Sequence, residues 1–360
     1  MLCENCKNLL YKRVAILFGL CAVALLLVGV VAASRGRFVG SGRHDLTAAE
    51  LRAHPSPYSP GARQRQHAAE ILRVRRRHDP KPRTKPRATI SIYEYTTRRA
   101  PYFRQGCKAA RRGATGVVIL DFGKPAYDGH TYGTILFSGV FAGNKKITRA
   151  MLAYASGYSH CLRRGSHDVI QLARGTSNYH PSVPSAFHAG RKWARETMML
   201  QHQLRQTHLD AHVVSAAADD VEPAWDRSFR RTRDFYRGYA STRVGHSLYN
   251  YGSLDGGIVD GVWSVHQAFY VTGGMRYARP IPEIYNKTMA RQWAALAQVA
   301  RRRYHRTIKF AGVMTMHTSS NHGMKPRDAH LALVRQLAIQ GHGSAPAAVP
   351  AAYTNIRADF

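Results

Sequence analysis

From Thr89 onward the chain alternates short apolar runs with longer amphipathic segments, and this alternation constrains the fold more than any other feature. An apolar run bounded by turn residues predicts a buried strand, and apolar spacing of i, i+3 and i+4 predicts a helix. Strands that alternate with helices form a parallel sheet with crossover helices. The predicted strands are Thr89–Thr96, Gly116–Phe122, Val169–Thr176, His212–Ala218, Ser247–Tyr251, Ala268–Thr272, Ile281–Tyr285 and Ile308–Thr315, and the predicted helices are Lys145–Cys161, Ser185–Gln206, Arg227–Tyr239, Thr288–Tyr304 and Pro326–Gln340.

The number and spacing of the predicted strands favour one parallel architecture. About eight strands over about 250 residues fit a TIM-like (β/α)8-type barrel. No GxGxxG or Walker A sequence follows any of these strands, which argues against a dinucleotide-binding fold. We therefore predict an α/β fold with a barrel over residues 88–342, and an open doubly wound sheet is the alternative.

The amino-terminal part contains an uninterrupted apolar run from Val14 to Ala33, preceded by Lys12 and Arg13. About 20 apolar residues span the hydrocarbon core of a bilayer as a helix, whereas the core of a signal peptide is usually shorter. We expect a short cytoplasmic segment at residues 1–13, a single transmembrane anchor at residues 14–33 and an extracytoplasmic remainder. Secretion after cleavage of a signal peptide is the alternative.

Residues 34–87 are rich in arginine and proline, which predicts a basic linker. The whole chain has 53 Lys and Arg against 21 Asp and Glu, a formal net charge of +32. Such an excess attracts polyanions, including anionic lipid and anionic polymers of the cell envelope. No nucleic-acid-binding motif accompanies the charge, so we expect no nucleic-acid partner. Residues 343–360 are predicted to form a carboxyl-terminal tail.

The cysteines and histidines bear on disulfides and metals. Cys107 and Cys161 are the two cysteines of the predicted exported part, and an oxidising compartment would permit them to pair. They are therefore a candidate disulfide, provided that their Cα atoms lie within about 7 Å. The 19 histidines show no HExxH spacing. We expect neither a metal site nor a cofactor.

The stretch from His212 to Trp225 contains the main candidate site. Its apolar run ends at Asp220 and Glu222, and side chains two residues apart on a strand point to the same face. These two carboxyl groups should therefore emerge together, with Asp219 and Val221 on the opposite face. At the carboxyl end of a barrel strand such a pair can act as acid and base. Helix capping or ion pairing with nearby arginines is the structural alternative.

Other polar and aromatic residues follow the remaining predicted strands, whose carboxyl ends would share one rim of a barrel. This mixture is typical of a carbohydrate site, because aromatic rings stack on sugars and paired carboxyl groups can hydrolyse a glycosidic bond. We predict an enzyme that acts on a polysaccharide or cell-envelope glycan, and the alternative is a non-catalytic protein that binds a glycan or the envelope. The candidate catalytic residues are Glu222, Asp220 and Asp121, and the candidate substrate-binding residues are Asn178, Tyr179, Trp225, Tyr249, Tyr251, Glu283 and Tyr285.

Five successive motifs resemble those of a little-characterised family of secreted or membrane-anchored bacterial proteins that is frequent in actinobacteria. The resemblance extends from about Cys107 to Thr315. It implies a glycoside-hydrolase-like (β/α) barrel, in a family without an assigned reaction. The motifs are LDFG from Leu120, GTSNY from Gly175, DVEPAW from Asp220, LYNYG from Leu248 and PEIY from Pro282.

A looser similarity exists to lysozyme-like hydrolases that carry Asp-x-Glu on one barrel strand and another Asp on the first strand. It implies that Glu222 is the general acid, Asp220 its electrostatic partner and Asp121 a positioning group. The chain lacks the DGxDxDxE run of chitinase-type barrels, and the sequence around Asp121 differs from that of a lysozyme. A shared fold does not establish a shared function.

Overall fold

The computed structural model describes residues 90–243, 245–254, 262–317, 322–341 and 349–357. The predicted cytoplasmic segment, the predicted anchor at residues 14–33 and the predicted linker at residues 34–87 lie outside these residues. Within the described ranges, no helix is both long enough and apolar enough to cross a membrane.

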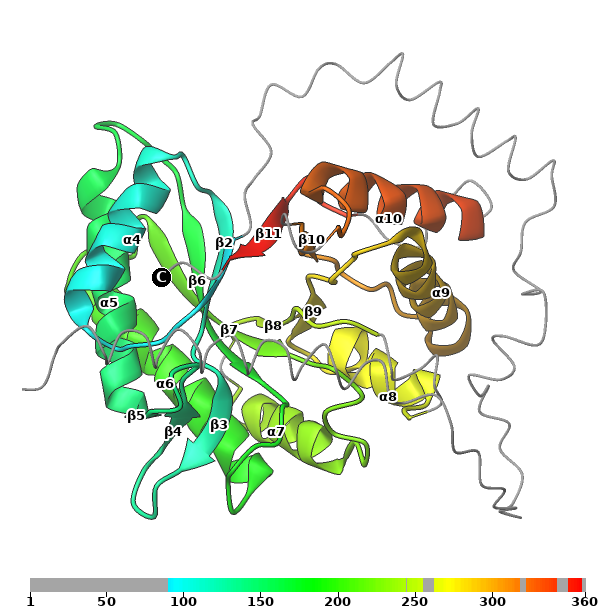
Figure 1. Ribbon diagram of the computed structural model, residues 1–360, viewed down its shortest axis with the longest axis horizontal. Helices are drawn as coiled ribbons and strands as arrows, with labels where there is room; N and C mark the ends of the chain where they lie inside the picture. The colour runs from blue at the N-terminus through cyan, green and yellow to red at the C-terminus, as the bar shows by residue number, and fades with distance from the viewer. Residues whose placement is uncertain (1–89, 244, 255–261, 318–321, 342–348, 358–360) are drawn as a thin grey trace, which may run out of the picture. The chain divides into compact units, whose positions relative to one another are not determined.

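A curled parallel sheet forms the centre of the described chain (Figure 1). Its eight strands within the described residues pair in the order β10-β11-β1-β2-β6-β7-β8-β9. Neighbours in the sheet are therefore consecutive along the chain, apart from a small insertion after β2 and from the pairing of the last strand, β11, with the first, β1. A doubly wound sheet would instead reverse its order at a switch point. The strands are β1 (Ile90–Tyr93), β2 (Gly116–Asp121), β6 (Ile170–Ser177), β7 (Val213–Asp220), β8 (Leu248–Asn250), β9 (Ala278–Pro280), β10 (Val313–Thr315) and β11 (Tyr353–Arg357).

The two edges of the curled sheet are connected by main-chain hydrogen bonds. The N–H of Met314 in β10 donates to the carbonyl of Pro282 at 2.9 Å, and the N–H of Ile284 donates to the carbonyl of Met314 at 2.8 Å. Both partners of Met314 lie just after β9, the strand at the other edge. These bonds satisfy main-chain groups that an edge strand would otherwise leave unpaired.

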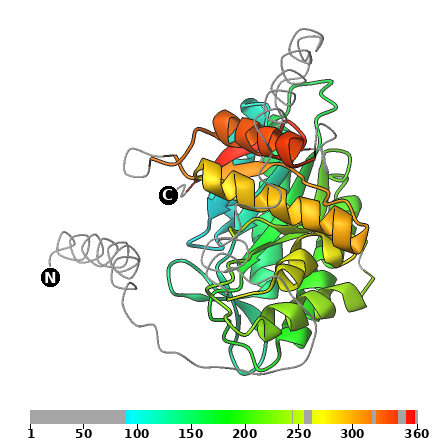
Figure 2. The same cartoon turned by 90° about the vertical axis from the view of Figure 1, so that its right-hand side faces the viewer.

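Helices lie between consecutive strands and cover the outer face of the sheet (Figures 1 and 2). Side-chain caps start several of them: Ser185 accepts the N–H of His188, and Asn286 accepts the N–H of Met289. The helices in the described residues are α4 (Arg99–Arg111), α5 (Asn144–Cys161), α6 (Ala186–Gln206), α7 (Arg230–Ser241), α8 (Val265–Phe269), α9 (Lys287–Tyr304) and α10 (Pro326–Gln340).

The strand predicted at Ala268–Thr272 is wrong. This segment is the end of α8 and a π-helical turn, η1 (Tyr270–Gly274). Apolar and β-branched residues favoured a strand, but Ser264 and Gln267 form a capping box that starts a helix before them. The strand in this part of the sheet is instead β9, three residues long.

The predicted tail at residues 343–360 is partly wrong as well. Residues Tyr353–Arg357 form β11, which pairs with β1 on one side and with β10 on the other. An insertion that the sequence did not predict follows β2 directly. It is a three-stranded antiparallel sheet made of β3 (Lys124–Tyr127), β4 (Tyr132–Ile135) and β5 (Phe141–Gly143).

The apolar core has an outer layer, between the sheet and its helices, and an inner layer enclosed by the sheet. The inner layer is one cluster of strand and strand-end residues and includes no helix residue. Small residues on β6 and β7, such as Ala173 and Ala218, leave room for Tyr249 and Tyr251 from the next strand. Gly175 is also on this face, and a Cβ there would lie 2.8 Å from a side-chain methyl of Ile119.

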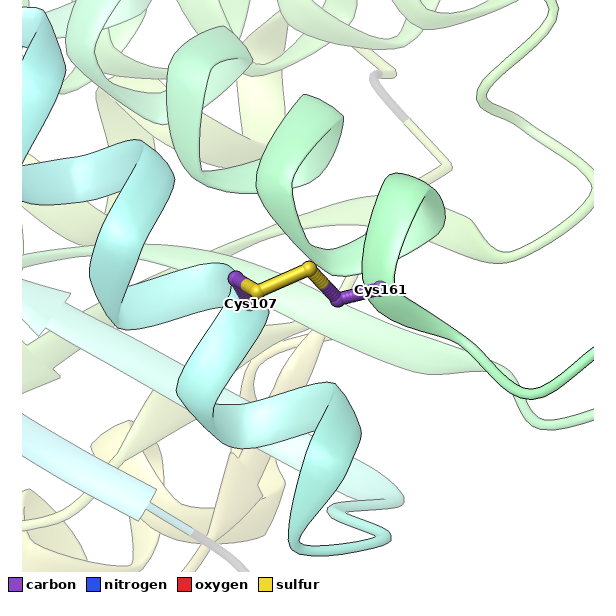
Figure 3. The surroundings of a disulfide bond; sticks show 2 residues. All are labelled: Cys107 and Cys161. Atoms are coloured by element: carbon purple, nitrogen blue, oxygen red, sulfur yellow. A yellow bond between two sulfur atoms is a disulfide. The ribbon is translucent and has the colours of Figure 1, made fainter.

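Helices α4 and α5 are joined covalently by a disulfide between Cys107 and Cys161 (Figure 3). Their Cα atoms are 4.9 Å apart, so the pairing that the sequence permitted is present. The two helices also approach very closely: a Cβ on Gly106 would lie 2.1 Å from the main-chain oxygen of Tyr154. The disulfide therefore joins helices that already pack backbone against backbone.

Candidate functional site

Acidic and aromatic side chains meet at the carboxyl ends of the strands. Tyr93 is the last residue of β1, Asp121 the last of β2 and Asp220 the last of β7. Burial raises the pKa of Tyr93, and the charges of Asp220, Glu283, Asp121 and Glu222 raise it further. These four carboxyl groups therefore lie near one phenol, and we call the five residues the acidic cluster.

Asp121 lies completely buried in the acidic cluster. Its Oδ1 accepts the N–H of Gly123 at 2.8 Å, which forms a tight turn after β2. Burial raises the pKa of Asp121 to about 7, although the Gly123 N–H and the Tyr251 hydroxyl act in the opposite direction. The carboxyl group is therefore partly protonated near neutral pH.

Asp220 is 6 % exposed, and its Oδ1 has no hydrogen-bond partner among the described residues. Burial is the main cause that raises its pKa, followed by the charges of Glu283, Glu222, Asp121 and Asp219. All of these neighbours are acidic, so each of them opposes ionisation of Asp220. Burial and these neighbours therefore favour the protonated form of Asp220.

Glu222 is half-buried, and its main chain is held by Asn178. The Asn178 Nδ2 donates to the Glu222 carbonyl at 3.0 Å, and the Glu222 N–H donates to the Asn178 Oδ1 at 3.0 Å. Asn178 Nδ2 also donates to the Thr232 hydroxyl at 3.2 Å. Asn178 was expected to bind substrate, but the structure places it as a buried support for the segment that carries Glu222.

Asp219 points away from the acidic cluster, as the alternation of the strand predicts. It lines a small cavity with Thr232 and Phe235 of α7. Val221 likewise packs in an apolar cluster that contains Phe235. The opposite faces predicted for Asp220 and Asp219 are therefore found in the structure.

Glu283 and Tyr285 are hydrogen-bonded to each other. The Tyr285 hydroxyl donates to Glu283 Oε2 at 2.6 Å. Burial, followed by the charge of Glu283, raises the pKa of Tyr285 above its usual range. Glu283 is buried, whereas Tyr285 is half-buried and reaches the surface beside the acidic cluster.

The two tyrosines of the LYNYG motif occupy different levels of the interior. Tyr251 is next to Asp121, and its hydroxyl donates to the carbonyl of Thr176 at 3.2 Å. Tyr249 points to the opposite end of the sheet, where its hydroxyl donates to Gln171 Oε1 at 2.5 Å. The structure thus brings Tyr251 to the candidate site and places Tyr249 in the packed interior.

Two groups of aromatic side chains lie beside the ends of the strands. Tyr179 is 47 % exposed and makes an edge contact with Trp225, with ring centroids 5.4 Å apart. Phe137 is 42 % exposed and lies 4.6 Å from the ring of Tyr93. Phe137 comes from the insertion after β2, so the insertion adds an aromatic ring beside the acidic cluster.

Tyr93 and Phe137 were not among the predicted site residues. For Tyr93 a signal was present, because it belongs to the predicted strand Thr89–Thr96, and its ring packs against the inner layer of the core. Phe137 gave no such signal, since it belongs to a loop between short strands that the sequence did not predict. Its position depends on a long-range contact, in which its N–H donates to the carbonyl of Glu94 at 3.3 Å.

The fold and the site define an α/β protein with a curled parallel sheet and a cluster of carboxyl groups at the carboxyl ends of its strands. Within the described residues, no group of three or more His, Cys, Asp or Glu side chains is arranged to hold a metal ion. No family model matches the chain, and a search of curated proteins finds no similar sequence.

Proposed function

We propose that the chain is a glycoside-hydrolase-like protein with a (β/α)8-type barrel, which acts on a polysaccharide or a glycan of the cell envelope. The observation that carries this proposal is the buried Asp220 within a cluster of other carboxyl groups, which together with burial raise its pKa. Hydrolysis of a glycosidic bond requires one carboxyl group that keeps its proton and another that is ionised. Active sites in barrels of this kind lie at the carboxyl ends of the strands, where this cluster is found.

Asp220 suits the role of general acid better than Glu222 does. The similarity to lysozyme-like hydrolases implied the reverse, with Glu222 as the acid. Burial and four acidic neighbours raise the pKa of Asp220 and so favour its protonated form, whereas Glu222 is only half-buried. In the proposed reaction Asp220 protonates the glycosidic oxygen, and Glu222 is the carboxylate that attacks the sugar or activates water.

Asp121 and the aromatic residues complete the proposed site. Asp121 is fixed by Gly123 and lies next to Tyr251, which fits a group that positions the substrate or the acid. Tyr179 and Phe137 offer exposed rings on which sugar faces can stack, and the half-buried Trp225 lies beside Tyr179. Carbohydrate-binding sites usually combine aromatic and carboxylate side chains.

The setting in the cell belongs to the proposal as well. The Cys107–Cys161 disulfide fits an oxidising compartment outside the cytoplasm. The apolar run at residues 14–33 would anchor the domain to the membrane, and the basic charge of the chain would favour an anionic envelope. A non-catalytic protein that binds envelope glycans through the same aromatic rings is the alternative.

Hydrolysis of a panel of polysaccharides and peptidoglycan by the purified chain tests the proposal. We expect release of new reducing ends, and a loss of about a hundredfold or more in Asp220→Asn and in Glu222→Gln. Asp234→Asn is the matched control, because Asp234 pairs with Arg233 and Arg237 on α7. Equal rates in all variants would overturn the catalytic assignment, and binding without hydrolysis would favour the alternative.

A further inference from the structure

Two adjoining hollows lie on the surface of α4. The first, of about 380 Å³, lies between α4 and the chain that follows β1, and its wall includes Tyr95, Arg104 and Lys108. The second, of about 470 Å³, is lined by Phe103 and Arg111 together with the same Arg104 and Lys108. Both volumes are of the size that small ligands occupy in proteins. We call this pair the α4 hollows.

The α4 hollows are positively charged. Arg104, Lys108 and Arg111 follow one another at spacings of four and three residues, which places them on one face of the helix. α4 contains no acidic residue, and the ion pairs found among the described residues involve arginines of β6 and α7 instead. Glu94 also lines the first hollow, but the two cations there outnumber it. The hollows therefore present a net positive charge to a ligand.

The first hollow is next to the acidic cluster. Glu94 in its wall directly follows Tyr93, the phenol of the cluster. The ring of Phe137 lies 4.6 Å from that of Tyr93 and 5.9 Å from that of Tyr95, so Phe137 contacts both places. We infer that the glycan bound at the acidic cluster contains uronate units, and that the carboxylate of such a unit binds Arg104 and Lys108 in the α4 hollows. This inference rests on the proposed function and names the class of its substrate.

Each of the α4 hollows combines an aromatic ring with the two shared cations. Tyr95 is half-buried in the wall of the first, and Phe103, which is 36 % exposed, lines the second. Such rings stack on the faces of sugars. Gln105 also lines the first hollow, and its Oε1 has no hydrogen-bond partner among the described residues. A sugar hydroxyl that donates to this oxygen would satisfy it.

A carboxylate suits the α4 hollows better than a neutral substituent does. The guanidinium of Arg104 can donate two parallel N–H groups to one carboxylate, and the ammonium of Lys108 adds a further donor and a second charge. The acidic cluster has the opposite preference, because the charges that raise the pKa of Tyr93 also oppose another anion beside it. We therefore expect a glycan in which uronate units alternate with neutral ones, with a neutral unit at the acidic cluster.

The test compares two hexasaccharides that differ only in their carboxyl groups. One alternates glucuronate with N-acetylglucosamine, and the other is the same molecule after reduction of its carboxyl groups to alcohols. Binding to the purified full chain is measured by calorimetry in the cold, and cleavage is followed by product analysis. We expect the acidic hexasaccharide to bind at least about tenfold more tightly than the reduced one. The double variant Arg104→Gln, Lys108→Gln should remove most of this difference.

The double variant Lys287→Gln, Arg291→Gln is the matched control. These two residues are exposed and four positions apart on α9, so the control loses the same charge at the same spacing. A general attraction of an anion to a chain of net charge +32 would fall equally in both double variants. We expect the control to retain the preference for the acidic hexasaccharide. Thermal unfolding checks that both double variants are folded.

The outcomes separate this inference from the proposed function. Equal affinity for the two hexasaccharides, an absence of binding, or an equal loss in the two double variants would overturn the inference. Cleavage of neutral glycans without a preference for the acidic hexasaccharide would leave the proposed hydrolase standing and refute the inference. A preference that depends on Arg104 and Lys108, without cleavage of any glycan, would support the inference and refute the catalytic proposal.

Discussion

The side-chain amide of Asn178 makes a hydrogen bond to both the N–H and the carbonyl of Glu222, each at 3.0 Å. The same arrangement occurs between Asn355 and His317, where the two distances are 3.1 and 3.2 Å. In both pairs an asparagine holds the chain that follows a neighbouring strand; Asn178 comes just after β6, and Asn355 lies within β11. The first pair supports a residue of the acidic cluster, and the second supports a histidine outside it.

This repetition provides a matched pair of variants. We expect Asn178→Ala and Asn355→Ala to lower the free energy of unfolding by similar amounts, about 1–3 kcal/mol each, because both leave main-chain groups unpaired. Only Asn178→Ala should also lower kcat, since it releases the segment that carries Glu222. Denaturant unfolding and steady-state kinetics measure the two effects. An equal loss of kcat in both variants would contradict the positioning role of Asn178.

The buried carboxyl group of Asp121 predicts a pH dependence of stability. Its pKa is about 7 in the folded chain, against an ordinary value of 3.8, so the folded state binds more protons between these values. Stability is therefore lost as the pH rises through this interval, by up to about 4 kcal/mol above pH 7. Asp121→Asn keeps an oxygen that can accept the Gly123 N–H and removes the ionisation.

Chemical unfolding at pH 5 and pH 8 measures this effect. The free energy of unfolding of Asp121→Asn, relative to that of the unmodified protein, should therefore be higher at pH 8 than at pH 5. Asp128→Asn is the control, because Asp128 is exposed and its pKa is lowered by the N–H groups of Thr131 and His130. A relative stability of Asp121→Asn that does not change with pH would show that Asp121 is not buried as described.

Removal of the hydroxyl group should lower activity at Tyr93 and stability at Tyr249. Tyr93→Phe removes a phenol that lies among four carboxyl groups, so we expect a loss of activity of about tenfold or more. Tyr249→Phe removes a hydrogen bond to Gln171, so we expect a loss of about 1 kcal/mol in stability and unchanged activity. Steady-state kinetics and thermal unfolding of both variants measure these effects. A loss of activity in Tyr249→Phe but not in Tyr93→Phe would contradict the assignment of Tyr93 to the site.

The disulfide between α4 and α5 should contribute to stability without affecting the site. Cys107 and Cys161 are 54 residues apart, and closing a loop of this size stabilises a folded chain by about 4 kcal/mol. The double variant Cys107→Ser, Cys161→Ser should therefore unfold at lower denaturant concentration and keep its activity. Adding a reductant to the unmodified protein should reproduce the shift, and the double variant should not respond to it.

Much of the sheet could be predicted because its central strands are buried on both faces. The apolar runs at Gly116–Phe122, Val169–Thr176 and His212–Ala218 correspond closely to β2, β6 and β7. Strands β9 and β11 were missed, since three to five residues carry little periodic signal. Their pairing depends on neighbours that are distant in sequence, and sequence pattern does not report such contacts.

The candidate site was predictable to a similar extent. The period of a strand placed Asp220 on the inward face and Asp219 on the other, and the structure agrees. It could not show that Tyr249 points toward Gln171, because both tyrosines of LYNYG share the inward face and differ only in depth. The raised pKa of Asp220 was also beyond prediction, since it arises from burial and from carboxyl groups that belong to different parts of the chain.

Strand β11 lies between β1 and β10, which joins the last described strand to the first. During synthesis β1 leaves the ribosome long before β11 does. The pairing of β11 with β1 and β10 is therefore the last to form. Until then β1 and β10 each expose an unpaired edge, which is a site for association with other chains. A nascent chain whose synthesis stops just before Tyr353 should therefore be prone to aggregation. Once Tyr353–Arg357 has been synthesised and has left the ribosome, the sheet should be able to close.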